Sequence, residues 1–363
     1  IADLKGKEYE KSLVWQTEEG FNVQPFYNSA DIAKIEEDLA HTHNSLLNTE
    51  NPDFGYRYWA NLQKIEVNDL EIANKQALKA LQTGADGIVF YINSIISSDN
   101  LGVLLKNIEL SYCVVSFRLK GLPGNFLQNL SVHVKKVNIA REKINGELIC
   151  DFAEAGETEL FSIFDQLAQL PNYKLQISLG STQLMYTTET ADLLAEAVKL
   201  TSTLVERGKE AKEIIPQISF GLHLRNNYFF EIARIRALRF LFTEIADSYG
   251  INFNPADLVI SAFTTVRIDE TTKEDPYLNM LSNTSQAMSG IIGGCNMLTV
   301  FPHNENLEET DEFSMHIARN VSNILKDEAY FDKVADPAAG SYYLEKLTEQ
   351  IAAKSWEAFQ EQV

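Results

Sequence analysis

Residues 275–304 read DPYLNMLSNTSQAMSGIIGGCNMLTVFPHN and place a predicted helix directly before a predicted strand. Asp275 followed by Pro276 is typical of a helix start, with the aspartate as N-cap and the proline in the first turn. Gly293 is expected to end that helix, and the run 295–302 is apolar and short enough for a buried strand. A helix that leads through a tight turn into a buried strand is the repeating unit of parallel α/β proteins.

The same alternation of short β-rich runs and longer helical runs extends back to about Arg57. Eight βα units predict a (βα)8 TIM barrel of the α/β class, which we assign to residues 56–363. The fourth strand is the weakest of the eight predictions. The predicted strands are YRYWANLQKI (56–65), ADGIVFYI (85–92), SYCVVSFRL (111–119), ELICDF (147–152), KLQISLG (174–180), QISFGLHL (217–224), DLVISAFTT (257–265) and CNMLTVFP (295–302).

Alternation in the fifth and sixth strands predicts what lines the barrel. Apolar residues should face the surrounding helices, so the small and polar residues between them should face the lumen. Most barrels fill the lumen with bulky branched side chains, so a polar lumen is either hollow or wet. The alternative is that large neighbours such as Phe117 or Phe263 fill it. The polar positions of these two strands are Gln176, Ser178, Gly180, Ser219, Gly221 and His223.

Composition excludes several classes of function. The chain has 363 residues, of which 45% are hydrophobic, and a formal net charge of −20, which opposes nonspecific nucleic-acid binding. No apolar run is long enough for a membrane span, and no secretory leader pattern opens the sequence. Three scattered cysteines make neither a disulfide framework nor a metal cluster, so we expect a cytoplasmic protein without a metal. His41 and His43 lack further metal ligands nearby in the sequence.

The segment 275–304, followed by HIARN (316–320) and ADPAAGSYYLE (335–345), resembles the methylmalonyl-CoA mutase family. Catalytic members of that family carry DPY…N, a GG-containing turn, R-I-A-R-N and DPAGGS at similar spacing. TEEGFNVQPFY (17–27) and YFFEIARIRALRFLF (228–242) resemble two further family segments, so the resemblance covers most of the chain. It implies a barrel that threads a coenzyme-A ester along its axis beneath adenosylcobalamin, and an N-terminal arm, residues 1–55, that contacts a partner subunit.

The family's catalytic side chains are largely absent. When the motifs are aligned, Leu222 stands at the position of an active-site tyrosine, and Leu62 stands at that of an arginine. Ser261, Phe263 and Thr265 stand at the positions of an arginine, a histidine and a glutamine, in that order. Donors beside a developing charge are each worth several kcal/mol in a dry site, so losing several should abolish turnover. His223 is the one retained catalytic candidate. The family's D-x-H-x-x-G cobalamin motif does not occur.

The resemblance therefore implies a non-catalytic small subunit of a heterodimeric, adenosylcobalamin-dependent mutase of propionate metabolism. The complex would interconvert methylmalonyl-CoA and succinyl-CoA, this chain would bind no cofactor itself, and the isolated chain could form a homodimer. An alternative is an active acyl-CoA mutase of altered specificity with its cobalamin domain on another chain. A third, an unrelated barrel hydrolase or aldolase, lacks a strand-centred lysine or a metal cluster. Substrate contacts in the lumen, if present, would come from Gln176, Ser178, Ser219, His223, Ser261 and Thr265.

Overall fold

The structure is a computed structural model, and it describes residues 8–33, 57–93, 97–152, 155–180, 185–307 and 311–363. The eight predicted runs form parallel strands that close into a barrel in the order β10-β3-β4-β5-β6-β7-β8-β9. The (βα)8 prediction, including its weakest fourth strand, is therefore confirmed. The strands are β3 (Ala60–Glu66), β4 (Gly87–Ile92), β5 (Val114–Leu119), β6 (Gly146–Ile149), β7 (Tyr173–Ser178), β8 (Ile218–His223), β9 (Val259–Phe263) and β10 (Met297–Thr299).

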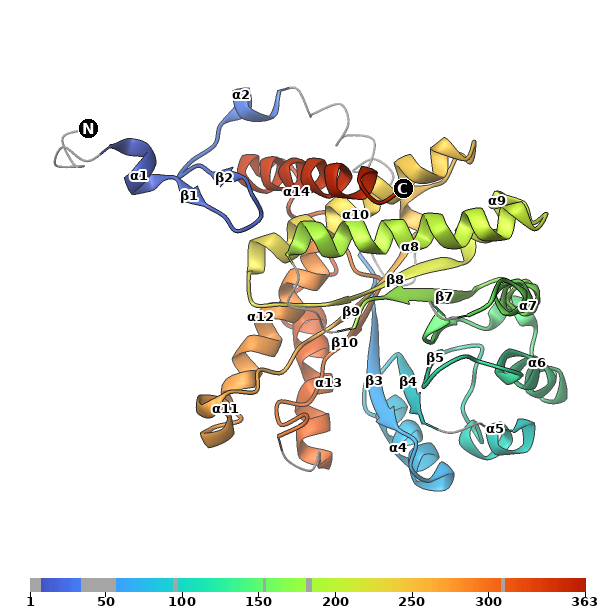
Figure 1. Ribbon diagram of the computed structural model, residues 1–363. Helices are drawn as coiled ribbons and strands as arrows, with labels where there is room; N and C mark the ends of the chain where they lie inside the picture. The colour runs from blue at the N-terminus through green and yellow to red at the C-terminus, as the bar shows by residue number, and fades with distance from the viewer. Residues whose placement is uncertain (1–7, 34–56, 94–96, 153–154, 181–184, 308–310) are drawn as a thin grey trace.

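Helices surround the barrel, one or more after each strand (Figure 1). The last helix, α14, packs outside α8 and α10 and adds a second helical layer on that side. The barrel helices are α4 (Leu70–Gln82), α5 (Ser98–Leu104), α6 (Phe126–Lys136), α7 (Glu157–Leu167), α8 (Tyr186–Glu206), α9 (Ala211–Ile214), α10 (Tyr228–Ser248), α11 (Glu270–Glu274), α12 (Leu278–Gly293), α13 (Glu312–Asp327) and α14 (Tyr342–Gln360).

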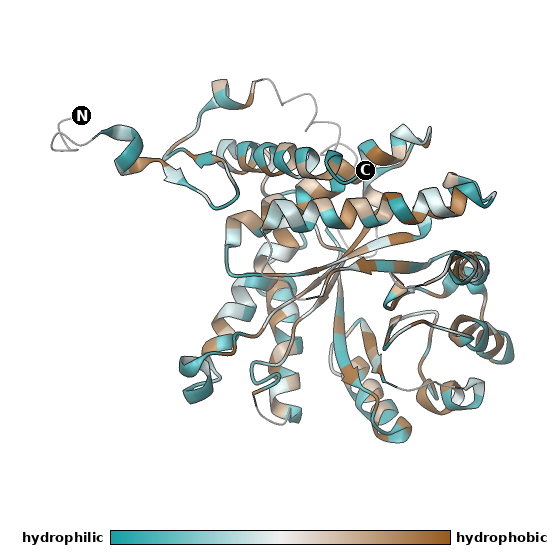
Figure 2. Ribbon diagram, in the orientation of Figure 1, coloured by the Kyte–Doolittle hydropathy of each residue, from teal (hydrophilic) through white to brown (hydrophobic). Residues whose placement is uncertain are grey.

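The main core lies between the strands and the helices. Phe220 of β8 meets Phe242 of α10 edge to face at 5.1 Å between ring centroids, and Phe117 of β5 meets Phe126 of α6 at 4.8 Å. Figure 2 shows apolar stretches along the barrel strands, whereas α1 and α11 are mostly hydrophilic. The apolar half of each strand's alternation thus holds the helices in place, and the other half faces the lumen.

The segment at 275–294 differs in detail from its prediction. The α-helix begins at Leu278, because Asp275 accepts a hydrogen bond from the backbone N–H of Tyr277 at 3.1 Å and forms a turn ahead of it. Gly294, at φ 107°, is the left-handed C-cap after Gly293. A Cβ on Gly293 would lie 3.1 Å from the Ile232 Cα, so this glycine allows close packing between α12 and α10 rather than against a strand.

The N-terminal extension, where described, consists of α1 (Tyr9–Leu13), β1 (Trp15–Gln16), β2 (Asn22–Val23) and α2 (Ser29–Ile32). β1 and β2 pair antiparallel, and the arm lies beside α14 and the start of α10 (Figure 1). The Glu19 carboxylate accepts hydrogen bonds from the backbone N–H of Tyr186 at 2.8 Å and from the N–H and hydroxyl of Thr187 at 3.0 and 2.7 Å. The arm therefore caps α8 of its own barrel. His41 and His43 lie outside the described residues.

Candidate functional site

Strand register decides which side chains enter the lumen. Ser178 of β7 pairs with Gly221 of β8, which pairs with Ser261 of β9, so these positions share one face of the sheet. Leu222 belongs to the opposite face and is buried in the core between strands and helices. The position aligned with the family's tyrosine thus lies outside the lumen, while the adjacent His223 faces into it against Phe263, at 5.5 Å between ring centroids.

A carboxyl group that sequence reasoning missed organises the middle of the lumen. Glu147 of β6 is 1% exposed, and its Oε2 accepts hydrogen bonds from the Gln176 amide at 2.8 Å and from the Ser261 hydroxyl at 2.5 Å. Ser219 contacts the same carboxyl. Burial raises the pKa of Glu147, and the hydrogen bonds from these three side chains only partly oppose that rise. Three of the six predicted lumen residues therefore converge on one buried acid.

An apolar cluster fills the rest of the lumen. Its buried members come from five strands and include Phe263, and the partly buried rings of Tyr91 and Phe301 pack against it. These contacts pack the middle of the lumen, and they favour the filled alternative over a hollow or wet channel at these positions. Phe263 fills the space as the alternative supposed, but Phe117 does not, because it faces α6. The buried members are Ala60, Leu62, Val89, Ile149, Phe263 and Met297.

Charged residues gather at the mouth, where the carboxyl ends of the strands meet. Lys64 of β3 forms ion pairs with Glu66, at 2.8 Å, and with Glu305 after β10. Its ammonium lies 4.6 Å from the ring centroid of Tyr91 and 5.3 Å from that of Phe301. Burial alone would lower the pKa of Lys64, but the hydrogen bonds that its ammonium donates to the two carboxylates outweigh burial and raise the pKa. A permanently charged, paired amine is unsuited to Schiff-base chemistry.

His223 is held neutral at the same mouth. Burial lowers the pKa of its imidazole to about 4, and the positive charges of Arg118 and Arg234 add to that effect. A neutral ring pressed against Phe263 is a poor general acid at neutral pH. The ring is also enclosed in the lumen, so it does not fit as an axial ligand for a corrinoid docked above the barrel.

The remaining predicted lumen residues have other positions. Thr265 follows β9, where its hydroxyl donates to the Leu224 carbonyl at 2.6 Å and its N–H donates to the Gln286 side chain at 2.6 Å. It ties the mouth to α12 and does not line the lumen. Ser178, at the end of β7, lines a cavity of about 220 Å³ beside the mouth.

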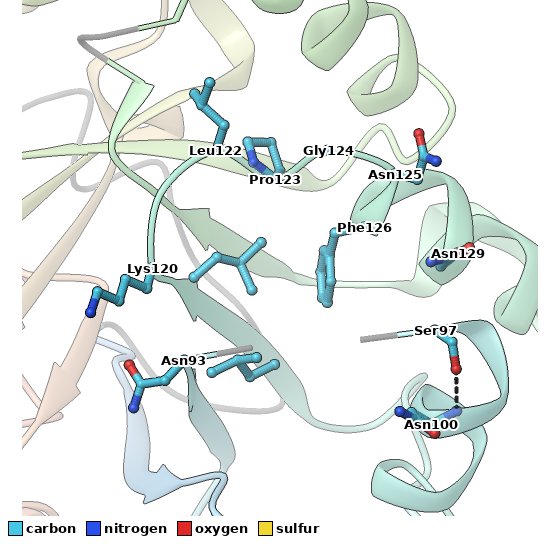
Figure 3. Close-up of a pocket in the computed structure, with 12 residues that line it drawn as sticks. Asn93, Ser97, Asn100, Lys120, Leu122, Pro123, Gly124, Asn125, Phe126 and Asn129 are labelled. Carbon is cyan, nitrogen blue, oxygen red and sulfur yellow. Dashed lines mark hydrogen bonds between the residues drawn. The ribbon is translucent and has the colours of Figure 1, made fainter. Parts of the chain in front are cut away.

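That cavity adjoins a larger groove of about 590 Å³ between the segments that follow β4 and β5 (Figure 3). Both are lined by Asn93 and Lys120. Figure 3 shows these two side chains at one end of the groove, Asn100, Asn125 and Asn129 at the other, and the Phe126 ring between them. These two spaces therefore lie to one side of the barrel axis, over β4 to β7.

Arg118, Glu147 and Lys64 are the site residues that the sequence analysis missed. Each stands on the lumen side of a predicted strand, so extending the alternation from the fifth and sixth strands to the first, third and fourth would have identified them. Among the described residues, no group of three His, Cys, Asp or Glu side chains is arranged to hold a metal ion. No helix in the described part of the chain has the length and apolarity to cross a membrane.

Fold and site together define a parallel (βα)8 barrel with a buried carboxyl group in its lumen and an ion-paired lysine at its mouth. A sequence model of the methylmalonyl-CoA mutase family matches residues 179–362, half of the chain, and the chain belongs to that family.

Curated relatives divide into two groups by identity. The chain is 35% identical over 99% of its length to the methylmalonyl-CoA mutase small subunit of Porphyromonas gingivalis, covering 60% of that protein. It is 36% identical over 48% of its length to the small subunit of Propionibacterium freudenreichii subsp. shermanii, covering 27% of that protein. Identity to the methylmalonyl-CoA mutase of Cereibacter sphaeroides is 26% over 99% of the chain, covering 56% of that protein. The chain thus spans 60% or less of each of these relatives.

Proposed function

We propose that this chain is the barrel of a non-catalytic small subunit of methylmalonyl-CoA mutase. In this proposal it pairs with a catalytic large subunit, and the heterodimer interconverts methylmalonyl-CoA and succinyl-CoA with adenosylcobalamin held by the large subunit. The small subunit contributes a stable barrel and a contact surface, and no reacting group. A cytoplasmic location is part of the proposal, in keeping with three free cysteine thiols, Cys113, Cys150 and Cys295.

The pattern of identity supports the assignment to a small subunit. Identity is 35–36% to two proteins named as small subunits, against 26% to a relative named simply as the mutase. Because these proteins share one family, the difference bears on the kind of subunit and not on the fold.

The packed middle of the lumen is the single observation on which the proposed absence of catalysis rests. A coenzyme-A ester threaded along the barrel axis would have to pass Phe263 and Met297, which are 2% and 9% exposed in the apolar cluster. It would also have to displace the hydrogen bonds to Glu147 and leave that carboxyl buried without partners, which costs several kcal/mol. The same obstacle opposes the alternative of an active mutase barrel with altered specificity.

The N-terminal arm supports the proposed partner surface. Its inner side is fixed to the barrel through Glu19, while Trp15 is 48% exposed and Phe26 is 69% exposed. Large apolar side chains left in solvent on an anchored segment are typical of a protein–protein contact. We therefore propose that residues 1–55 contact the large subunit, and that a homodimer forms through the same surface when the large subunit is missing.

The test combines binding, assembly and turnover. The isolated chain should show no saturable uptake of methylmalonyl-CoA by calorimetry and no rearrangement of it with adenosylcobalamin and a separate cobalamin-binding domain. Co-expressed with a mutase large subunit, it should purify as a 1:1 complex. Trp15→Ser with Phe26→Ser should weaken that complex, whereas exchanging the exposed Tyr112, far along the chain on the β4–β5 side, for Ser should not.

Turnover by the isolated chain would refute the non-catalytic assignment. If the large subunit does not bind this chain, the proposed partner is refuted. If it binds the chain equally well after both arm substitutions, the proposed arm surface is refuted.

A further inference from the structure

The 220 Å³ cavity beside the mouth has a cation in its wall whose role the fold does not explain. It lies across the carboxyl ends of β4, β5, β6 and β7, and Tyr91, Arg118 and Ile149 occupy neighbouring register positions in its inner wall. A volume of 220 Å³ corresponds to roughly seven water molecules at about 30 Å³ each. That is space for a short-chain metabolite within the cavity itself.

Arg118 is an available charge in this wall. Its guanidinium lies 5.6 Å from the Tyr91 ring centroid, and within the described part of the chain no carboxylate lies within 4.0 Å of it in an ion pair. Lys64, which faces the same mouth, differs because Glu66 and Glu305 already engage its ammonium. The N–H groups of a half-buried guanidinium that has no counter-ion remain able to donate hydrogen bonds to a ligand in the cavity.

The charge balance of the cavity selects for a monoanion. Arg118 and Lys120 are its basic lining residues and Asp151 is its acidic one, so the wall carries a net charge of +1. The neutral His223 adds no charge. The ion-paired Lys64, Glu66 and Glu305 at the same mouth together carry −1, so the positive charge belongs to the cavity lining itself.

The rest of the lining suits a short hydrocarbon chain next to the charge. Ile92, Leu119 and Ile149 provide apolar wall, and Asn93 and Ser178 provide polar groups beside it. The paired N–H donors of a guanidinium match the two oxygens of a carboxylate. A phosphate dianion can also accept from them, but it has no hydrocarbon chain to place against the apolar wall. The groove in Figure 3, which shares Asn93 and Lys120 with the cavity, offers a route in from solvent.

We propose that this cavity binds a small aliphatic monocarboxylate, with Arg118 holding the carboxylate and the apolar wall holding the chain. The site is formed by this chain alone. It needs neither the proposed large subunit nor a thioester, so it stands or falls separately from the assignment to a small subunit.

The test uses the purified chain, with sodium butyrate as the probe and chloride and inorganic phosphate at matched ionic strength as comparisons. Butyrate should bind saturably at one site by calorimetry and raise the unfolding temperature, whereas phosphate should do neither. Arg118→Met should weaken butyrate binding by about 10- to 100-fold, the loss expected for a charge-assisted pair of hydrogen bonds. Arg118→Lys, which keeps the charge without the fork, should bind with intermediate affinity.

Lys75→Met removes a charge from the exposed face of α4 and serves as the matched control, with binding unchanged. Thermal unfolding of each variant without ligand separates a lost site from a lost fold. The proposal is overturned if butyrate does not bind at millimolar concentration, if phosphate competes with equal affinity, or if Arg118→Met binds butyrate as the parent does.

Discussion

Glu147 and His223 lie in the same lumen, and burial pushes their pKa values in opposite directions. Burial disfavours the charged form of each group, so it raises the pKa of the carboxyl and lowers that of the imidazole. Both shifts favour neutral side chains in the folded barrel. Around Glu147 the polar side chains hydrogen-bond to one another, so polar residues at these strand positions pack together.

Glu147→Gln should make the barrel more stable than the parent protein at neutral pH. The pKa of Glu147 in the folded protein is raised above the ordinary value of 4.5. The stability that the protonated carboxyl contributes to the parent protein is therefore fully present below pH 4.5, and it is lost as pH rises through the folded pKa. The stability difference should grow with pH in that window, by at most about 1.4 kcal/mol per pH unit. Urea unfolding at several pH values measures it, and the exposed Glu71→Gln on α4 should show no such trend.

Removing the Arg118 charge should raise the pKa of His223 from about 4 toward its ordinary value of 6.5, while leaving the effect of burial in place. Since the folded pKa is the lower one, the parent protein should lose stability as pH falls from 6.5 toward 4. NMR titration of the His223 ring in Arg118→Met provides the measurement. An unchanged midpoint would show that the guanidinium does not face this histidine.

At the scale of the elements, some glycines are required because the backbone adopts a left-handed conformation, and others are not. Gly294 ends α12 at φ 107° and lets the chain enter β10. Gly102 lies inside α5, where an added Cβ would meet no atom closer than 4.0 Å. A change from glycine to alanine should therefore have opposite effects on stability at the two sites. At Gly294 it disfavours the conformation that the turn needs, whereas at Gly102 it reduces the conformational freedom of the unfolded chain.

Gly294→Ala should destabilise the protein by about 1–2 kcal/mol, the cost of a left-handed conformation for a residue with a Cβ. Gly102→Ala should be neutral or stabilise it by up to about 1 kcal/mol, since alanine has the higher helix propensity. Chemical denaturation of the pair tests both signs at once. Equal effects would mean that the α12–β10 turn can relax.

At the scale of the whole molecule, a carboxylate and several aromatic contacts join the arm to the barrel. The first backbone N–H groups of α8 have no partner within the helix, and Glu19 supplies an acceptor from 167 residues earlier in the chain. Trp15 and Phe21 add ring contacts with Phe230 of α10, at 5.4 and 6.0 Å between centroids. The arm is thus part of the folded unit and also carries the exposed apolar surface proposed for the partner.

Glu19→Ala should lower stability by about 2 kcal/mol and speed proteolytic cleavage of the arm, because it leaves the start of α8 uncapped and releases the arm. Limited proteolysis with thermal unfolding gives both readouts. The neighbouring Glu18, which is exposed, should tolerate the same change. Cleavage at the parent rate in Glu19→Ala would show that the aromatic contacts alone hold the arm.

Local patterns were sufficient for the barrel. Short β-rich runs between longer helical runs predicted all eight strands, because the length and composition of a run can be read within one segment. The state of the lumen was not legible in this way. Which side chains Phe263 packs against, and whether Glu147 meets Gln176 and Ser261, depend on register between strands far apart in sequence. Register around a closed barrel is fixed by its overall closure and not by any one strand, and for that reason only the tertiary structure decided it.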